Sequence, residues 1–66
     1  MTDGQYLLAI YRLGLNQASA ARFLRIGNST SRRYADEGGV PHATAMLLQL
    51  MIDRNITPAD LGFVDD

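Results

Sequence analysis

The chain has 66 residues, of which 47% are hydrophobic and 20% are charged, and it contains no cysteine. This length and composition indicate one folded domain over residues 1–66, and they exclude a disulfide-stapled core and a thiolate metal site. No apolar run approaches the ~18 residues of a membrane span, and the start lacks the basic region of a signal peptide, so we expect a soluble, cytoplasmic protein.

Charge is divided unevenly along the sequence. Residues 4–35 contain five arginines and no acidic residue, whereas residues 36–66 contain six acidic residues and one arginine. The two segments therefore carry +5 and −5, and Asp3 brings the net charge to −1. A segment that bears arginines without carboxylates favours a polyanionic partner, and arginine suits bidentate contact to phosphate and guanine.

The first helix is expected from about residue 3 to residue 13. Thr2 or Asp3 can cap its start, and Gly14 can close it in the left-handed conformation that helix ends favour. Tyr6 and Ile10 lie one turn apart and begin the stripe that faces the core.

Residues 17–36 are expected to form two short helices joined by a tight turn. Asn16 is a good N-cap for the first of them, and Asn28 or Ser29 is expected to cap the second. Small alanines in the first helix allow another helix to approach closely, and the outer face of the second carries two adjacent arginines. This pattern predicts a helix-turn-helix.

A fourth helix is expected to begin at Pro41 and to run to about residue 53. It has two apolar stripes, one that includes Met46 and Leu50 and another that includes Leu48 and Ile52. In so short a chain, a helix that is apolar on two sides is expected to be shared between its own core and a second subunit. One last helical turn makes the prediction all-α with five helices. The predicted homodimer surface consists of Ala45, Leu48, Ile52 and Phe63.

Residues 17–34 carry an entry glutamine, a close-contact alanine, apolar residues on both sides of the turn and a polar, basic second helix. The matching positions are Leu15, Gln17, Ala21, Leu24, Ile26, Thr30, Arg32, Arg33 and Tyr34. In type and spacing they resemble the helix-turn-helix of the Cro/phage-repressor-like (XRE-type) family, and the resemblance extends over about residues 5–52. It implies a compact five-helix, lambda-repressor-like domain that acts as a small transcriptional regulator, most often an autoregulating repressor.

The resemblance also implies that the second helix of the motif enters the major groove of double-stranded DNA, with no cofactor. Arg32 or Arg33 would pair bidentately with guanine, Asn28 would read adenine, and Gln17 would contact a phosphate. A homodimer would bind an inverted-repeat operator. The implied DNA-binding residues are Gln17, Asn28, Ser29, Thr30, Arg32, Arg33, Arg22 and Arg25.

Two positions depart from the family pattern. Arg25 stands where the family usually has glycine, at a turn position prone to positive φ, where an arginine would cost roughly 1 to 2 kcal/mol. Either the turn is reshaped, with Gly27 taking part, or the strain is tolerated because Arg25 contributes to binding. Ser31 stands where the family commonly buries an aliphatic residue, and we expect its hydroxyl to bond back to the carbonyl four residues earlier.

Enzymes are the class that the sequence excludes most firmly, because it has no paired nucleophile and base and no glycine-rich phosphate loop. His42 is the only histidine and is read as a surface residue, so we expect no metal site and no small-molecule ligand. The competing interpretation is a protein-interaction module, either an adaptor or an antitoxin-type domain, whose apolar fourth helix engages a different protein. A basic outer face on the third helix would distinguish DNA binding from that alternative.

Overall fold

The computed structural model describes residues 1–64, and over these residues the chain is all-helical. This confirms the all-α prediction, but the fifth helix is a single 3-10 turn of three residues. Within the described residues, no helix combines the length and the apolarity that crossing a bilayer requires. The elements are α1 (Asp3–Arg12), α2 (Gln17–Leu24), α3 (Asn28–Glu37), α4 (His42–Asp53) and the 3-10 turn η1 (Ala59–Leu61).

The first two helices begin with the caps that the sequence predicted. The Thr2 hydroxyl accepts a hydrogen bond from the Gln5 backbone (3.2 Å), and the Gln5 side chain accepts one from the Thr2 backbone (2.9 Å). Asn16 and Ser19 make the same reciprocal pair, with both bonds at 2.8 Å. Each capping box satisfies two backbone N–H groups that a helix start otherwise leaves open. The start of each helix is therefore set locally by the sequence.

The N-cap predicted for the third helix is wrong. The cap residue of α3 is Gly27, which has no side chain to offer, and Asn28 is the first residue of the helix. The first-turn backbone N–H groups of α3 therefore have no side-chain cap. The positive end of the helix dipole is consequently not covered by the protein's own capping group.

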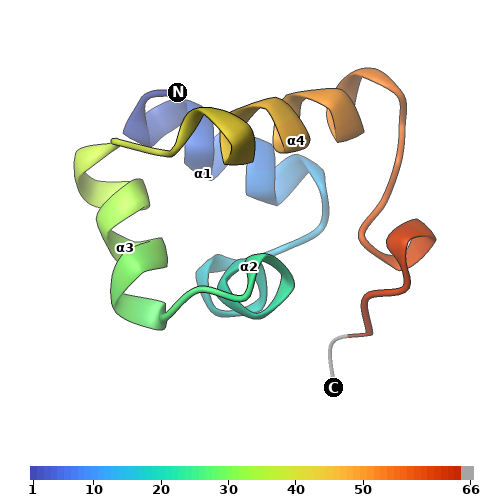
Figure 1. Ribbon diagram of the computed structural model, residues 1–66, viewed down its shortest axis with the longest axis horizontal. Helices are drawn as coiled ribbons and strands as arrows, with labels where there is room; N and C mark the ends of the chain where they lie inside the picture. The colour runs from blue at the N-terminus through green and yellow to red at the C-terminus, as the bar shows by residue number, and fades with distance from the viewer. Residues whose placement is uncertain (65–66) are drawn as a thin grey trace.

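Helix α1 is the centre of the arrangement, because it packs against α2, α3 and α4. Figure 1 shows α4 alongside α1 on one side of the molecule, α2 on the opposite side, and α3 connecting the two sides at one end. The Cα radius of gyration is 10.7 Å, which matches the ~10.8 Å that a compact chain of this length is expected to have. This packing leaves α3 with one face turned away from the core.

The core is built on four large side chains that are almost fully buried, Tyr6, Ile10, Leu48 and Met51. Tyr6 and Ile10 come from α1, as the predicted stripe required, and the ring of Tyr6 meets that of Tyr34 edge to face at 5.5 Å. Alanines on the inner face of α2 let it approach α3 closely, as expected. The core therefore joins all four α-helices.

The predicted dimer surface is corrected by this core. Leu48 is 0% exposed, so its side chain is enclosed by its own chain and cannot contact a second subunit. Ala45, Ile52 and Phe63 are half-buried and pack against the same cluster. Phe63 also meets Phe23 edge to face at 5.3 Å, which attaches the C-terminal turn to α2. Of the four predicted positions, Leu48 is the one that its own chain encloses completely.

A hydrogen-bond network lies inside the core and joins three helices. The Ser31 hydroxyl donates to the Gln17 carbonyl (3.1 Å) and shares a 2.8 Å hydrogen bond with the Tyr6 hydroxyl. The expectation that Ser31 bonds back within its own helix is therefore wrong, because its partners come from α1 and α2. Burial raises the pKa of the Tyr6 hydroxyl and Tyr34 adds to the increase, whereas the hydrogen bond with Ser31 opposes it.

Candidate nucleic-acid interface

The turn between α2 and α3 depends on one left-handed residue. Arg25 has φ 56° and ψ 46°, whereas Gly27 has φ −69°, which any residue can adopt. The turn is therefore not reshaped around Gly27, and Arg25 itself carries the conformation that costs an L-residue about 1 to 2 kcal/mol. The next residue, Ile26, is half-buried and donates its backbone N–H to the Ala21 carbonyl (2.9 Å), which closes the end of α2.

Ser31 fixes how α3 sits on α2. Its hydroxyl is bonded to the backbone of Gln17, the first residue of α2, so the buried side of α3 is fastened to the start of α2. Ala35 lies one turn later on the same buried side of α3. The positions between them, Arg32 and Arg33, therefore face solvent, and both side chains are exposed.

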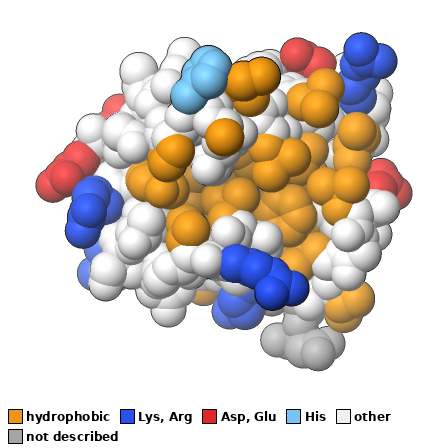
Figure 2. All heavy atoms as spheres, viewed as in Figure 1, with side chains coloured by type: hydrophobic (Ala, Val, Ile, Leu, Met, Phe, Trp, Pro, Cys, Tyr) orange, Lys and Arg blue, Asp and Glu red, His pale blue; other side chains and the backbone are white. Residues whose placement is uncertain are grey.

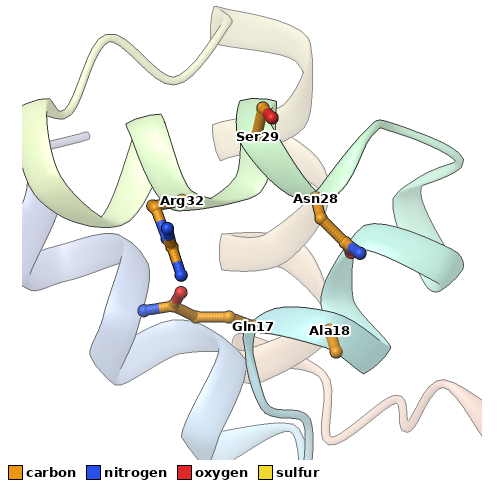
Figure 3. Close-up of a pocket in the computed structure, with 5 residues that line it drawn as sticks. All are labelled: Gln17, Ala18, Asn28, Ser29 and Arg32. Carbon is orange, nitrogen blue, oxygen red and sulfur yellow. The ribbon is translucent and has the colours of Figure 1, made fainter.

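A concavity of about 400 Å³ lies where the start of α2 meets α3. Figure 3 shows the Gln17 amide and the Arg32 guanidinium pointing toward each other across it, one from each helix. Four of its five lining residues were predicted as DNA contacts, and Ala18 was missed. Ala18 follows Gln17 at the exposed start of α2, and that neighbourhood is the signal that could have identified it. The lining residues are Gln17, Ala18, Asn28, Ser29 and Arg32.

The other predicted contacts are placed elsewhere. Arg33 is exposed on α3 outside this concavity, and Thr30 is half-buried. Arg22 and Arg25 are exposed at the far end of α2, where they line a second hollow together with residues 61–64. The structure thus brings half of the eight predicted residues together, leaves Thr30 and Arg33 elsewhere on α3, and leaves Arg22 and Arg25 at the far end of α2.

The charges of α3 are divided along its length. Neither Arg32 nor Arg33 makes an ion pair with a carboxylate in the part of the chain that the structure describes. Asp36 and Glu37 follow one turn later, in the last turn of the helix. An anion that approaches α3 therefore meets free guanidinium groups and an uncapped N-terminal turn first, and meets carboxylates only at the other end.

No metal centre is apparent in this region. Over residues 1–64, no group of three or more His, Asp or Glu side chains is arranged so that it could hold a metal ion.

Comparison with protein-family models, with curated proteins and with solved structures found no match to this chain. The interpretation of the α2–α3 surface therefore depends on its own geometry and charge.

Proposed function

We propose that this protein binds duplex DNA through α2 and α3, which act as a helix-turn-helix with α3 in the major groove. The observation that carries the proposal is the exposed outer face of α3, where Arg32 and Arg33 have no carboxylate partners in the described part of the chain and Arg32 lines a concavity shared with the start of α2. Backbone phosphates provide most of the affinity of such proteins, and side chains that reach base edges provide the specificity. Both kinds of group are present on this surface.

Individual roles follow from chemistry and position. In this proposal Arg32 pairs with a guanine, and the Gln17 amide toward which it points supports the guanidinium while that helix start contacts a phosphate. Asn28, in the first turn of α3, suits an adenine edge. Ser29 and Arg33 supplement these contacts. Arg22 and Arg25 lie further out and suit the DNA backbone.

In this proposal, the protein forms a homodimer and acts as a transcriptional regulator that represses its own synthesis. Two copies related by a two-fold axis would present their α3 helices about one helical turn of DNA apart, ~34 Å, so the operator is an inverted repeat. The small size of the domain supports this assembly, because one protomer offers only a short recognition helix and a small core.

Binding to labelled duplex DNA, followed by fluorescence anisotropy between about 50 and 200 mM salt, tests the proposal. We expect Arg32→Ala to weaken binding by roughly 10-fold or more, because a bidentate guanine contact contributes ~1 to 3 kcal/mol. Arg54→Ala is the matched control, since Arg54 is an exposed arginine just after α4 and is expected to have no effect. An equal loss of DNA affinity in the two variants, or an affinity that does not fall as the salt concentration rises, would contradict the proposal.

A second candidate function is supported by a different surface. A groove of about 400 Å³ runs between α1 and α4, lined by apolar side chains such as Leu8 and Met46 with a polar rim that includes Arg12 and His42. Such a groove suits a helix of another protein, as in an adaptor or an antitoxin-type module. That function would survive the loss of Arg32, so the same variant separates the two candidates.

A further inference from the structure

Helix α4 has two apolar sides, and the core uses only one. Leu48 and Met51 are 0% and 1% exposed, whereas Met46 and Leu50 on the opposite side are 58% and 49% exposed. The exposed stripe consists of Ala43, Met46, Leu47 and Leu50, at spacings of three and four residues that keep them on one face. No charged residue occurs between His42 and Asp53. The exposed side of α4 therefore carries an apolar stripe of its own.

This stripe continues onto the neighbouring helix. Leu8 of α1 is 65% exposed and lines the groove between α1 and α4 together with Met46. The side chain of Gln49, which lies beside the stripe, is hydrogen-bonded within its own helix, where its amide N–H donates to the Asp53 carboxylate (2.9 Å). Figure 2 shows a further apolar area in the middle of the face that it draws, between α4 and α2, with most charged groups around the edge. Continuous apolar surface of this kind marks an interaction site.

We infer that a second copy of this chain covers the exposed side of α4, with the two α4 helices packed antiparallel about a two-fold axis near Met46 and Leu47. This inference rests on the homodimer proposed above and replaces the surface expected from the sequence. A two-fold axis at the middle of the stripe places Met46 against Leu47 of the partner subunit. It also places the small Ala43 opposite the large Leu50 of the partner subunit. The stripe is therefore complementary to itself, as an isologous interface requires.

The ends of the helix favour the antiparallel direction. His42 is the first residue of α4 and Asp53 the last, and both are exposed. In an antiparallel pair, the positive end of each helix dipole lies beside the partner's negative end and its Asp53. A parallel pair would place like ends together. Charge and shape therefore select the same arrangement.

The size of the stripe sets the expected strength. A standard interface covers ~800 Å² per partner, which is just under a fifth of the 4368 Å² surface of the described chain. The exposed side of a 12-residue helix is only about 18 Å long and about 10 Å wide. Even when Leu8 is added, the stripe therefore covers much less than a standard interface, so the contact belongs to the weak end of the range. We expect a dimer with a dissociation constant on the order of micromolar.

Disulfide trapping tests the position of the two-fold axis, because the chain has no cysteine of its own. We expect Leu47→Cys to form an intermolecular disulfide under mild oxidation, since residues beside the axis come within the ~4 Å that two bridged Cβ atoms need. Leu61→Cys is the matched control: Leu61 is also an exposed leucine, but it lies on η1. Cross-linking at residue 61 that equals or exceeds that at residue 47 would overturn the inference.

Sedimentation velocity over a range of concentrations tests the energetics. We expect Leu50→Glu to raise the dimer dissociation constant at least 10-fold and Leu61→Glu to leave it unchanged; both side chains are exposed, so neither change disturbs the core. A wild-type protein that stays monomeric at hundreds of micromolar, or a Leu50→Glu variant that still dimerises normally, would overturn the inference. If Leu50→Glu dissociates the dimer but no duplex DNA is bound, this interface stands and the proposed function fails. Loss of DNA binding by Arg32→Ala in a protein that remains dimeric supports both.

Discussion

Arg25 joins α2 to α3 in the left-handed region of φ and ψ, where L-residues other than asparagine and aspartate are uncommon. Its backbone N–H bonds to the Arg22 carbonyl at 3.3 Å, and the backbone of Ile26 continues the turn. The side chain is exposed and lies near the C-terminal turn. The conformation therefore costs stability through the backbone, while the guanidinium remains available to an external anion.

Replacing Arg25 with glycine should stabilise the protein. The substitution removes the steric cost of about 1 to 2 kcal/mol. It also raises the conformational entropy of the unfolded chain, which lowers the stability by about 0.5 to 1 kcal/mol. We expect a net gain of roughly 0.5 to 1 kcal/mol in the free energy of unfolding, measured by urea denaturation. Arg25→Ala keeps the strain but removes the side chain, so it should leave stability near that of the wild type. A lower stability for Arg25→Gly would rule out the strain interpretation.

At the scale of elements, the bond between Tyr6 and Ser31 connects α1 to α3, and the bond from Ser31 to Gln17 connects α3 to α2. Tyr6 and Ser31 are both 0% exposed. Substituting Ser31 with alanine would leave the buried tyrosine hydroxyl without a partner, and it would remove the hydrogen bond that connects α3 to the Gln17 carbonyl. An unsatisfied buried polar group costs ~1 to 3 kcal/mol. This network therefore contributes strongly to the stability with which α3 packs against α1 and α2.

We expect Ser31→Ala to lower the free energy of unfolding by about 1 to 3 kcal/mol in urea denaturation. Tyr6→Phe should cost less, because Ser31 keeps its bond to Gln17. In the Ser31→Ala background, Tyr6→Phe should cost still less or even restore stability, since it removes the unpaired hydroxyl. Additive effects of the two substitutions would show that the groups do not interact.

Alkaline pH gives an independent measurement of the burial of Tyr6. Burial raises the pKa of Tyr6 in the folded protein, whereas in the unfolded chain the pKa is about 10. Above pH ~10 the unfolded state therefore loses this proton first, and the free energy of unfolding falls as the pH rises. Below pH ~10 the contribution is fully present. Tyr6→Phe should make the pH dependence in this range shallower.

Features that depend on a few neighbouring residues could be predicted from the sequence. The caps at Thr2 and Asn16, the stripe of Tyr6 and Ile10 and the left-handed tendency at residue 25 all follow from short-range rules. The start of α3 was misplaced because Asn28 and Gly27 are both acceptable caps, and only the packing of α3 decides between them. The reach of the Ser31 hydroxyl to Gln17 could not be predicted, because it depends on how three helices meet.

The two stripes of α4 show the same limit at the candidate interfaces. Leu48 and Leu50 belong to stripes of similar hydrophobicity, so the sequence indicates a two-sided helix without showing which side meets α1. The packing of α1 against α4 buries Leu48 and leaves Leu50 exposed. By contrast, four of the five residues that line the concavity at α2 and α3 were predicted as a group, because Gln17, Asn28, Ser29 and Arg32 belong to one short, continuous segment. Residues close in sequence constrain each other's positions, whereas opposite faces of a helix are chosen by distant partners.

At the scale of the whole molecule, the fold keeps part of the acidic segment away from Arg32 and Arg33, while Asp36 and Glu37 lie in the last turn of α3 itself. Arg32 and Arg33 project from α3, whereas Asp53 ends α4 and Asp60 lies in η1. In the proposed complex, the acidic end would be held away from the phosphates, which limits affinity for DNA of arbitrary sequence. An inverted repeat would engage both α3 helices of a dimer, so pairing of subunits compensates for the modest affinity of one protomer.

Dimerisation across α4 should also make the thermal stability depend on concentration. A folded dimer that unfolds to separate chains gains about 0.7 kcal/mol per chain for each tenfold rise in protein concentration, half of the ~1.4 kcal/mol that a tenfold change represents. For a domain of this size, that corresponds to a rise of roughly 3 to 6 °C in the midpoint of thermal unfolding. Circular dichroism melts between about 5 and 500 µM span the expected micromolar dissociation constant.

The variant Leu50→Glu supplies the decisive comparison. Its side chain lies on the exposed stripe, so the folded protomer should remain intact while the pairing of subunits is lost. We expect its midpoint to be independent of concentration and to equal that of the wild type at the lowest concentration. If the midpoint of thermal unfolding rises with concentration in both proteins, the subunit contact lies elsewhere. If it rises in neither, the small core is sufficient for a stable protomer.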